Sequence, residues 1–365
     1  MATQGAQHRV SEWGLVSAKA RRDPFNEIEV DVVFTGEGGE TWKVPAYWAG
    51  SVAWRVRFAP PRPGRYRFES VCSDASDAGL HGQTGVLEAG PGEGPSALWE
   101  HGPVRVSADR RYLEHADGTP YLWVGDTWWM GLTKRLDWPA GFRSLLEDRV
   151  RKGFNTIQIV AGPLPDFCAT KATWDPQQAN EAGWPWERDY ARINPAFFDL
   201  ADRRIALLVE SGLMPCIVGM WGYYLPFMGV DRCRKHWRYL VARYGAYPVV
   251  WCLCGECTMP TYEHMGKPEH KGDSDVQKAG WTEVARYVRQ IDPFRRVLTV
   301  HPCSSGRHLL RGGCPNQEPR NQMPPGCLRR SCLPRSQNPR RPRRPSPFRR
   351  TPSNSPSSCS RWNRP

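Results

Sequence analysis

The chain of 365 residues is long enough for one large domain and one small domain, and its net charge of +13 at pH 7 raises the question of a nucleic-acid partner. Residues 304–365 contain 14 Arg, no Lys and one acidic residue, so residues 1–303 hold 36 basic and 36 acidic side chains and have no net charge. We therefore expect no nucleic-acid partner, because the part of the chain that is rich enough in apolar residues to fold is neutral.

Hydropathy and the number and spacing of cysteines indicate the cellular compartment in which the protein is expected. The first thirty residues contain no apolar leader, and no stretch reaches the roughly 18 apolar residues of a membrane span. Eight of the 12 cysteines precede residue 304, and their spacing indicates no disulfide framework. We expect a cytoplasmic protein with reduced cysteines and no membrane partner. The 17 Trp slightly favour sugar binding, although Trp also fills cores.

Residues 9 to 90 have the pattern of an all-β domain. Apolar and polar residues alternate over residues 27–34 (EIEVDVVF) and 52–58 (VAWRVRF), as in half-buried strands. The proline-rich turn at residues 60–64 leads into another alternating run at 65–71 (RYRFESV). Short strands separated by Gly and Pro predict an antiparallel, immunoglobulin-like sandwich. Gly and Pro at residues 89–95 predict a linker over residues 91–102.

From residue 103 to residue 303 the pattern changes to strands that alternate with amphipathic helices. The apolar runs lack polar alternation, which indicates a parallel sheet covered on both faces. Because no Gly-rich phosphate loop follows the first run, we predict a (β/α)₈ TIM-type barrel, incomplete after about five βα units, rather than a dinucleotide-binding fold. The five predicted strands are residues 121–124, 154–160, 214–218, 249–253 and 297–300.

Residues 304–365 are rich in Arg, Pro and Ser and have almost no aliphatic side chains. Such a segment cannot bury enough surface to fold, so we predict a disordered tail. A barrel that stops after its fifth strand would leave an open sheet edge, which is costly. We therefore interpret the abrupt change of composition as a shifted reading frame or a truncation, with a natural basic tail as the alternative.

Seven segments occur in order along the chain: WRVRF (54–58), PRPGRYRF (61–68), YLEHADGTP (112–120), YLWVGDTWW (121–129), DRVRKGFNTIQIV (148–160), residues 180–204 and VVWCLCGE (249–256). Together they resemble the apiosidase-like glycoside hydrolase family and the sandwich domain that often precedes it. The resemblance covers residues 9 to 302 and implies hydrolysis of glycosidic bonds in complex or plant-type polysaccharides by two carboxylates. It places the acid/base after the fourth barrel strand and the nucleophile after the seventh.

Glu256 is the candidate acid/base, because it follows the fourth predicted strand at the end where barrel enzymes hold their catalytic groups. The alternative is an ordinary Glu at the start of a loop. Gly255 departs from the Asn that many related barrels place before this Glu. After Asp292 the only carboxylate is Glu318, so the resemblance leaves the nucleophile without a counterpart. We therefore expect either a glycoside hydrolase that is inactive as written or a non-catalytic carbohydrate-binding fragment of a defective gene.

Other polar and aromatic residues follow predicted strands and are candidates for binding a saccharide substrate. Asp126 would contact sugar hydroxyls and Trp128 and Trp129 would form a stacking platform; a structural ion pair of Asp126 with an Arg is the alternative. The aromatic loop at residues 184–186 has the character of a lid. We expect Asp126, Glu256 and the remaining candidates to converge on one open mouth. Those candidates are Gln158, Trp221, Tyr223 and His301.

Four cysteines near the candidate site raise the question of a metal. Cys252, Cys254 and Cys257 form a C-x-C-x-x-C run, with Cys303 further along the chain. A structural zinc site would need a second paired cluster, which the sequence lacks. We expect buried thiols, no metal and no cofactor.

Overall fold

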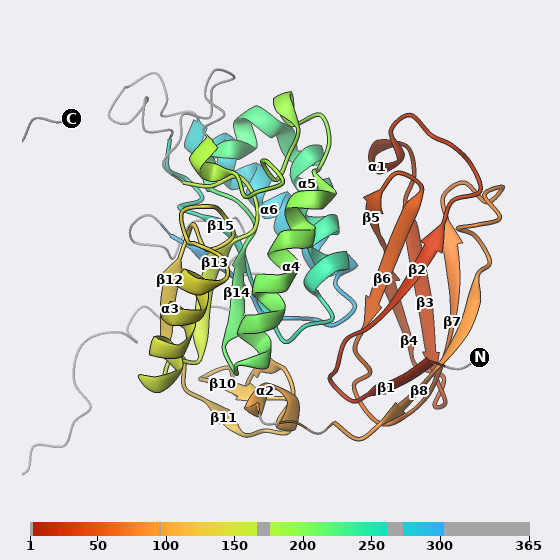
Figure 1. The fold of residues 1–365 in the computed structure, drawn as a ribbon, viewed down its shortest axis with the longest axis horizontal. Coiled ribbons are helices and arrows are strands. Elements are labelled where there is room, and N and C mark those ends of the chain that lie inside the picture. The colour runs from red at the N-terminus through yellow and green to blue at the C-terminus, as the bar shows by residue number, and fades with distance from the viewer. Residues whose placement is uncertain (1–2, 93, 95, 166–175, 261–272, 303–365) are drawn as a thin grey trace, which may run out of the picture. The chain divides into compact units, whose positions relative to one another are not determined.

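The computed structural model describes residues 3–92, 94, 96–165, 176–260 and 273–302 (Figure 1). The predicted tail, residues 304–365, lies outside the described residues. The β-rich part and the α/β part belong to a single compact unit. In the described part of the chain, none of the helices is long and apolar enough to cross a membrane.

Two β-sheets form the N-terminal part. Phe34 and Phe58, one from each sheet, stack with 4.2 Å between ring centroids, and Trp13 lies 5.2 Å from Phe68 across the same core. The first sheet has the order β1 (Thr3–Ala6), β8 (Thr84–Gly90), β7 (Gly64–Cys72), β3 (Val30–Gly36) and β4 (Thr41–Pro45), and the second has the order β2 (Ser11–Val16), β6 (Ala53–Phe58) and β5 (Tyr47–Gly50). The short helix α1 (Pro24–Glu27) follows β2.

The observed strands differ from the predicted domain in one respect. Strand β1 begins at Thr3, before residue 9, and pairs in parallel with β8, whereas the other pairs of these two sheets are antiparallel. The strand was missed because its sequence, TQGA, has no apolar alternation. The immunoglobulin-like topology and the boundaries of the domain stay predictions.

Asp77 ties the loop between β7 and β8 to the loop after β2. Its side chain is fully buried and accepts hydrogen bonds from Ser17 Oγ and from Arg21 Nη1, each 2.5 Å away. The main-chain N–H of Ala18 also donates to this carboxylate, at 2.9 Å. Burial alone would raise the pKa of Asp77, but the hydrogen bonds from Ser17 and Arg21 outweigh it and lower the pKa to about 2.

Asp77→Asn should lower the free energy of unfolding by about 1–3 kcal/mol at pH 7, because an amide replaces one of the two carboxylates that pair with Arg21, the other being Asp74. A lowered carboxylate pKa stabilises the fold above the pKa of the unfolded chain, and this stability is lost as pH falls toward about 2. Urea denaturation at pH 7 and pH 3 measures both effects: the difference between the two proteins should be smaller at pH 3. An equal difference at both pH values would contradict the assignment.

The predicted linker contains a buried helical turn rather than an open connection. Ser96 caps α2 (Ala97–Glu100) by accepting a hydrogen bond from the N–H of Leu98, and both Leu98 and Trp99 are buried. A small antiparallel sheet follows, with the order β11 (Pro120–Tyr121), β10 (Leu113–His115) and β9 (Val104–Val106).

A parallel sheet of five strands forms the framework of the C-terminal part. Its strand order follows the chain without reversal, as in a barrel, whereas a doubly wound sheet reverses order at a switch point. Closure into a barrel stays a prediction. The strands are β12 (Gly125–Trp128), β13 (Thr156–Val160), β14 (Met214–Val218), β15 (Val250–Gly255) and β16 (Leu298–His301). The intervening helices are α3 (Ala140–Arg151), α4 (Pro195–Glu210), α5 (Leu225–Tyr244) and α6 (Asp273–Ile291). Single 3₁₀ turns are η1 (Pro176–Gln178), η2 (Arg188–Tyr190) and η3 (Gly222–Tyr224).

The first parallel strand lies later than predicted. The apolar run at residues 121–124 was predicted as a strand, but β12 begins at Gly125. Just before β12, the side chain of Asn155 forms hydrogen bonds with the main chain of residues 122 and 124. Asn155 Nδ2 donates to Leu122 O at 2.6 Å, and Val124 N donates to Asn155 Oδ1 at 2.9 Å. Leu122, Trp123 and Val124 are each more than a third exposed. An apolar run carries no register signal, so this side-chain pairing was not readable from the sequence.

A buried cluster of charges joins strands β2 and β6 to helices α4 and α5. Asp202 of α4 accepts hydrogen bonds from Arg57 of β6, at 2.6 Å, and from Arg243 of α5, at 2.8 Å. The guanidinium of Arg243 is fully buried and also donates to the hydroxyl of Tyr239. Glu12 of β2 accepts from Arg57 Nε at 2.7 Å.

Candidate active site

Glu256 lies directly after β15, at the carboxyl end of the parallel strands. Its φ of 45° is in the left-handed region, which is uncommon for a residue other than Gly, Asn or Asp. The main-chain N–H of Glu256 donates to His301 O at 2.7 Å, and Trp221 Nε1 donates to its Oε2 at 3.2 Å. The carboxylate is therefore oriented by an indole, and its backbone is held by the neighbouring strand β16.

Gly255 has a steric role in this arrangement. A Cβ at this position would lie 2.2 Å from the ring of Trp221, so any other residue would displace the indole. The Asn found here in related barrels is thus incompatible with the observed position of Trp221. Gly255, which departs from the family pattern, therefore leaves the space that Trp221 occupies when it donates its hydrogen bond to Glu256.

Three aromatic rings gather around Glu256. Trp129, which follows β12, lies 5.3 Å from the ring of Trp221 and 5.3 Å from that of His301, and the rings of Trp221 and His301 are 6.0 Å apart. These residues come from three separate segments at the carboxyl ends of the strands. The structure therefore brings four of the predicted site residues together.

Asp126 and Trp128 are not part of this cluster. Asp126 Oδ2 accepts from Arg149 Nε of α3 at 2.5 Å and from Trp128 Nε1 at 3.0 Å. Burial alone would raise the pKa of Asp126, but the bonds from Arg149 and Trp128 outweigh it and lower the pKa. Trp128 is buried, with its ring 5.3 Å from Phe142 of α3. Neighbouring side chains on a strand point to opposite faces, so this pair faces the helix while Trp129 faces the site.

Gln158 and Tyr223 also lie apart from the rings around Glu256. Gln158 is in register with Thr127 and Cys216, a layer deeper in the sheet than the end of β15. Tyr223 is buried, and its hydroxyl is 3.5 Å from Leu164 O, which indicates a packing role. The aromatic loop is no open lid either, because Trp186 is buried and donates to His236 Nδ1 at 3.1 Å. These positions were not predictable, because the sequence does not specify the direction in which each side chain points.

The cysteine run beside Glu256 is part of the core. Cys252, Cys254 and Cys257 are free thiols and fully buried, whereas Cys303 lies outside the described residues. Burial raises the pKa of Cys254. Within residues 3–165, 176–260 and 273–302, no group of three or more His, Cys, Asp or Glu side chains is arranged to hold a metal ion.

Fold and site define an α/β protein with a carboxylate and aromatic rings at the carboxyl ends of sequentially ordered parallel strands. The apiosidase-like catalytic domain family matches residues 107–320, and a domain of unknown function, DUF5060, matches residues 5–73. The chain belongs to the apiosidase-like family, whose model covers more than half of it.

Comparison with solved structures concerns the fold alone. A candidate glycoside hydrolase from Bacteroides vulgatus is 21% identical, with a TM-score of 0.61, and the match covers 82% of this chain and 56% of that protein. The chain thus spans little more than half the length of this relative. A family 5 glycoside hydrolase from the same organism is 20% identical over 58% of this chain and 44% of that one, but its TM-score of 0.42 is too low to support an argument. None of the curated protein sequences matches the chain.

Proposed function

We propose that the chain carries the acid/base half of a glycoside hydrolase site, with Glu256 as the group that protonates the leaving oxygen of a glycosidic bond. The supporting observation is the position of Glu256, held by Trp221 and His301 at the carboxyl ends of the parallel strands. In barrel enzymes this end holds the active site. Family membership adds the expectation of an incomplete (β/α)₈ barrel.

The aromatic rings supply the second element of the proposal. Trp129 is partly exposed and packs against Trp221, the buried indole that donates to Glu256. Its flat ring suits the apolar face of a sugar. Saccharides of complex or plant-type polysaccharides are the proposed substrate class. The Arg149–Asp126 pair keeps the other predicted carboxylate on the α3 side, so it does not serve as the partner of Glu256.

Hydrolysis by two carboxylates requires separations of about 5–5.5 Å for retention or about 6.5–9.5 Å for inversion of configuration. Glu256 is one such group, and the resemblance places its partner on a seventh strand that the given sequence does not contain in recognisable form. We therefore infer binding without turnover for the chain as given. A non-catalytic carbohydrate-binding protein is the second candidate.

The chain as given should not hydrolyse aryl glycosides, whereas a chain extended by the remaining βα units should do so. The extension is obtained by translating the coding DNA beyond codon 303 in its other two frames. Release of nitrophenol measures turnover, and calorimetric titration with oligosaccharides measures binding. Turnover by the chain as given would contradict the missing-partner proposal, and an extended chain that binds sugars without turnover would favour the binding protein.

A further inference from the structure

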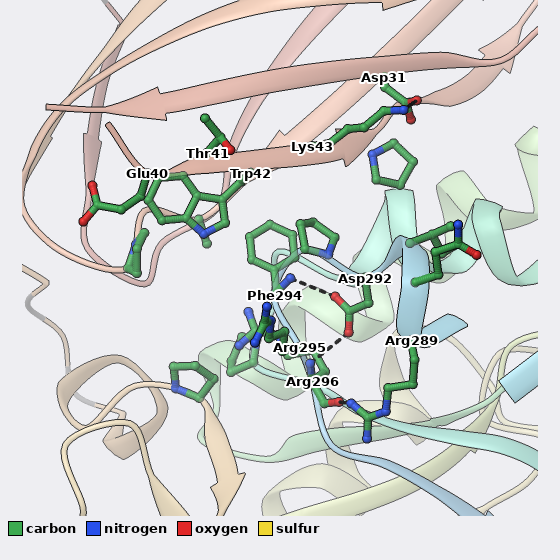
Figure 2. A pocket seen from close by; sticks show the side chains of 18 of the residues that line it. Asp31, Glu40, Thr41, Trp42, Lys43, Arg289, Asp292, Phe294, Arg295 and Arg296 are labelled. Carbon is green, nitrogen blue, oxygen red and sulfur yellow. Dashed lines mark hydrogen bonds and ion pairs between the residues drawn. The ribbon is translucent and has the colours of Figure 1, made fainter. Parts of the chain in front are cut away.

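A cavity of about 790 Å³ lies between strand β4 of the sandwich and the segment that joins α6 to β16. Figure 2 shows the side chains of Trp42 and Phe294 directed into this space from its two walls. We refer to it as the β4 groove. It is separate from Glu256, because Phe294 and Arg296 precede β16 whereas His301 ends it. The groove and the candidate active site thus lie at opposite ends of the parallel strands.

The aromatic walls of the β4 groove are held in place from behind. The ring of Trp42 lies 5.7 Å from that of Phe58 and 5.7 Å from that of Tyr66, and the ring of Phe294 lies 6.0 Å from Phe58. Trp42 and Phe294 nevertheless remain partly exposed. Aromatic surface that is rigid and partly open suits stacking on the apolar face of a pyranose ring at little entropic cost.

The acidic side chains of the β4 groove have partners within the protein. Asp31 accepts from Lys43 Nζ at 3.0 Å and from Arg238 Nη2 at 2.6 Å. Glu40 forms an ion pair with Arg62. Asp292 accepts from the indole N–H of Trp251 at 2.9 Å and from the main-chain N–H groups of Phe294 and Arg296 (Figure 2). Each of these carboxylates is therefore already engaged by an ion pair or by hydrogen bonds within the protein.

The cations of the β4 groove outnumber these carboxylates. Five cationic side chains and three acidic ones line it, which leaves a formal charge of +2. Arg295 is exposed, is not paired with a carboxylate of the described residues, and has a φ of 51°, in the left-handed region. Among the described residues, the side chain of Arg296 donates to two main-chain oxygens, those of Gly245 at 2.9 Å and Ala246 at 3.4 Å. The cationic residues are Lys43, Arg238, Arg289, Arg295 and Arg296.

We propose that the β4 groove is a second saccharide site, distinct from the Glu256 site, and that it binds acidic oligosaccharides such as oligouronates. Trp42 and Phe294 stack on the sugar rings. Arg295, which is free to reorient, pairs with a sugar carboxylate, since a guanidinium matches carboxylate geometry with two parallel N–H donors. Binding at this site is a function additional to the proposed hydrolysis. It does not require the chemistry at Glu256.

The test compares two hexamers with the same β-1,4-linked manno backbone, mannuronate hexamer and mannohexaose, by calorimetric titration into the full chain. The acidic hexamer should bind roughly tenfold more tightly in low salt, and this advantage should shrink as salt screens the charges. Trp42→Ala should weaken binding of the acidic hexamer roughly tenfold, because it removes a stacking wall. Arg295→Gln should abolish the preference for the acidic hexamer.

Two control variants separate this site from the rest of the protein. Trp123→Ala removes a Trp that is 38% exposed outside the groove and should leave affinity unchanged. Arg203→Gln changes an exposed Arg of α4 outside the groove and should also leave it unchanged. Because neither readout involves Glu256, a failure of the hydrolase proposal does not affect this result. If Trp42→Ala does not fold, exposed Arg295 still decides the outcome. Equal affinity for both hexamers, no binding of either, or wild-type affinity in Arg295→Gln would overturn the proposal, as would tighter binding of an acidic peptide or an oligonucleotide.

Discussion

Glu256→Gln should slow hydrolysis of glycosides with poor leaving groups by about 10²–10⁴-fold in a chain extended by the remaining βα units, because an amide cannot protonate the departing oxygen. Dinitrophenyl glycosides should lose far less activity, since their leaving groups need little help from an acid. The change is isosteric and keeps an acceptor oxygen for Trp221 Nε1, so the hydrogen bond that orients the side chain can persist. Loss of activity then reports proton transfer rather than misfolding.

A series of aryl glycosides with leaving groups of different acidity gives the measurement. The rate should depend more steeply on leaving-group acidity in the variant than in the parent. Asp126→Asn is the matched control, because its carboxylate faces Arg149 of α3 and should not change that dependence. An extended enzyme that is indifferent to loss of Glu256 would refute the acid/base assignment.

Asp202→Asn should lower the free energy of unfolding at pH 7 by about 2–4 kcal/mol, because it removes the carboxylate shared by two buried guanidinium groups, those of Arg57 and Arg243. Each of them then keeps only a more exposed partner, Glu12 or Asp199. Burial raises the pKa of Asp202, but Arg243 and Arg57 more than offset this and hold the pKa below its usual value. The stabilisation is therefore present above about pH 4 and is lost as pH falls through the lowered pKa. The variant should show a smaller loss at acid pH.

Asp231→Asn is the control for this cluster. Asp231 is 93% exposed and 3.6 Å from Arg234, so its loss should change stability by less than about 1 kcal/mol. Urea denaturation followed by tryptophan fluorescence measures both variants. Because Asp202 links α4 to strand β6, unfolding of the two N-terminal sheets and of the parallel sheet should become less cooperative in Asp202→Asn. Equal effects of the two substitutions would contradict a structural role of the buried cluster.

Element types were predictable wherever the apolar pattern was long. The strands β13, β14, β15 and β16 and the helices between them agree with periodicity, because a buried parallel strand and an amphipathic helix each impose a repeating pattern on the sequence. Family membership was also predictable, because motifs such as VVWCLCGE occur along the chain in the order expected of the family. β12 was displaced, because Asn155 replaces strand pairing at residues 122–124 with side-chain hydrogen bonds.

The sequence by itself determined the order of strands and helices, the neutral charge of residues 1–303 and the place of Glu256 after the fourth strand of the parallel sheet, since all three depend on local pattern and composition. Only the tertiary structure decided that Trp129 packs against Trp221 and His301 while Asp126 and Trp128 face α3. Side chains alternate along a strand, so a shift of one residue exchanges the two faces. The β4 groove and the Asp202 cluster likewise depend on residues far apart in the chain, and no local pattern specifies which of them meet.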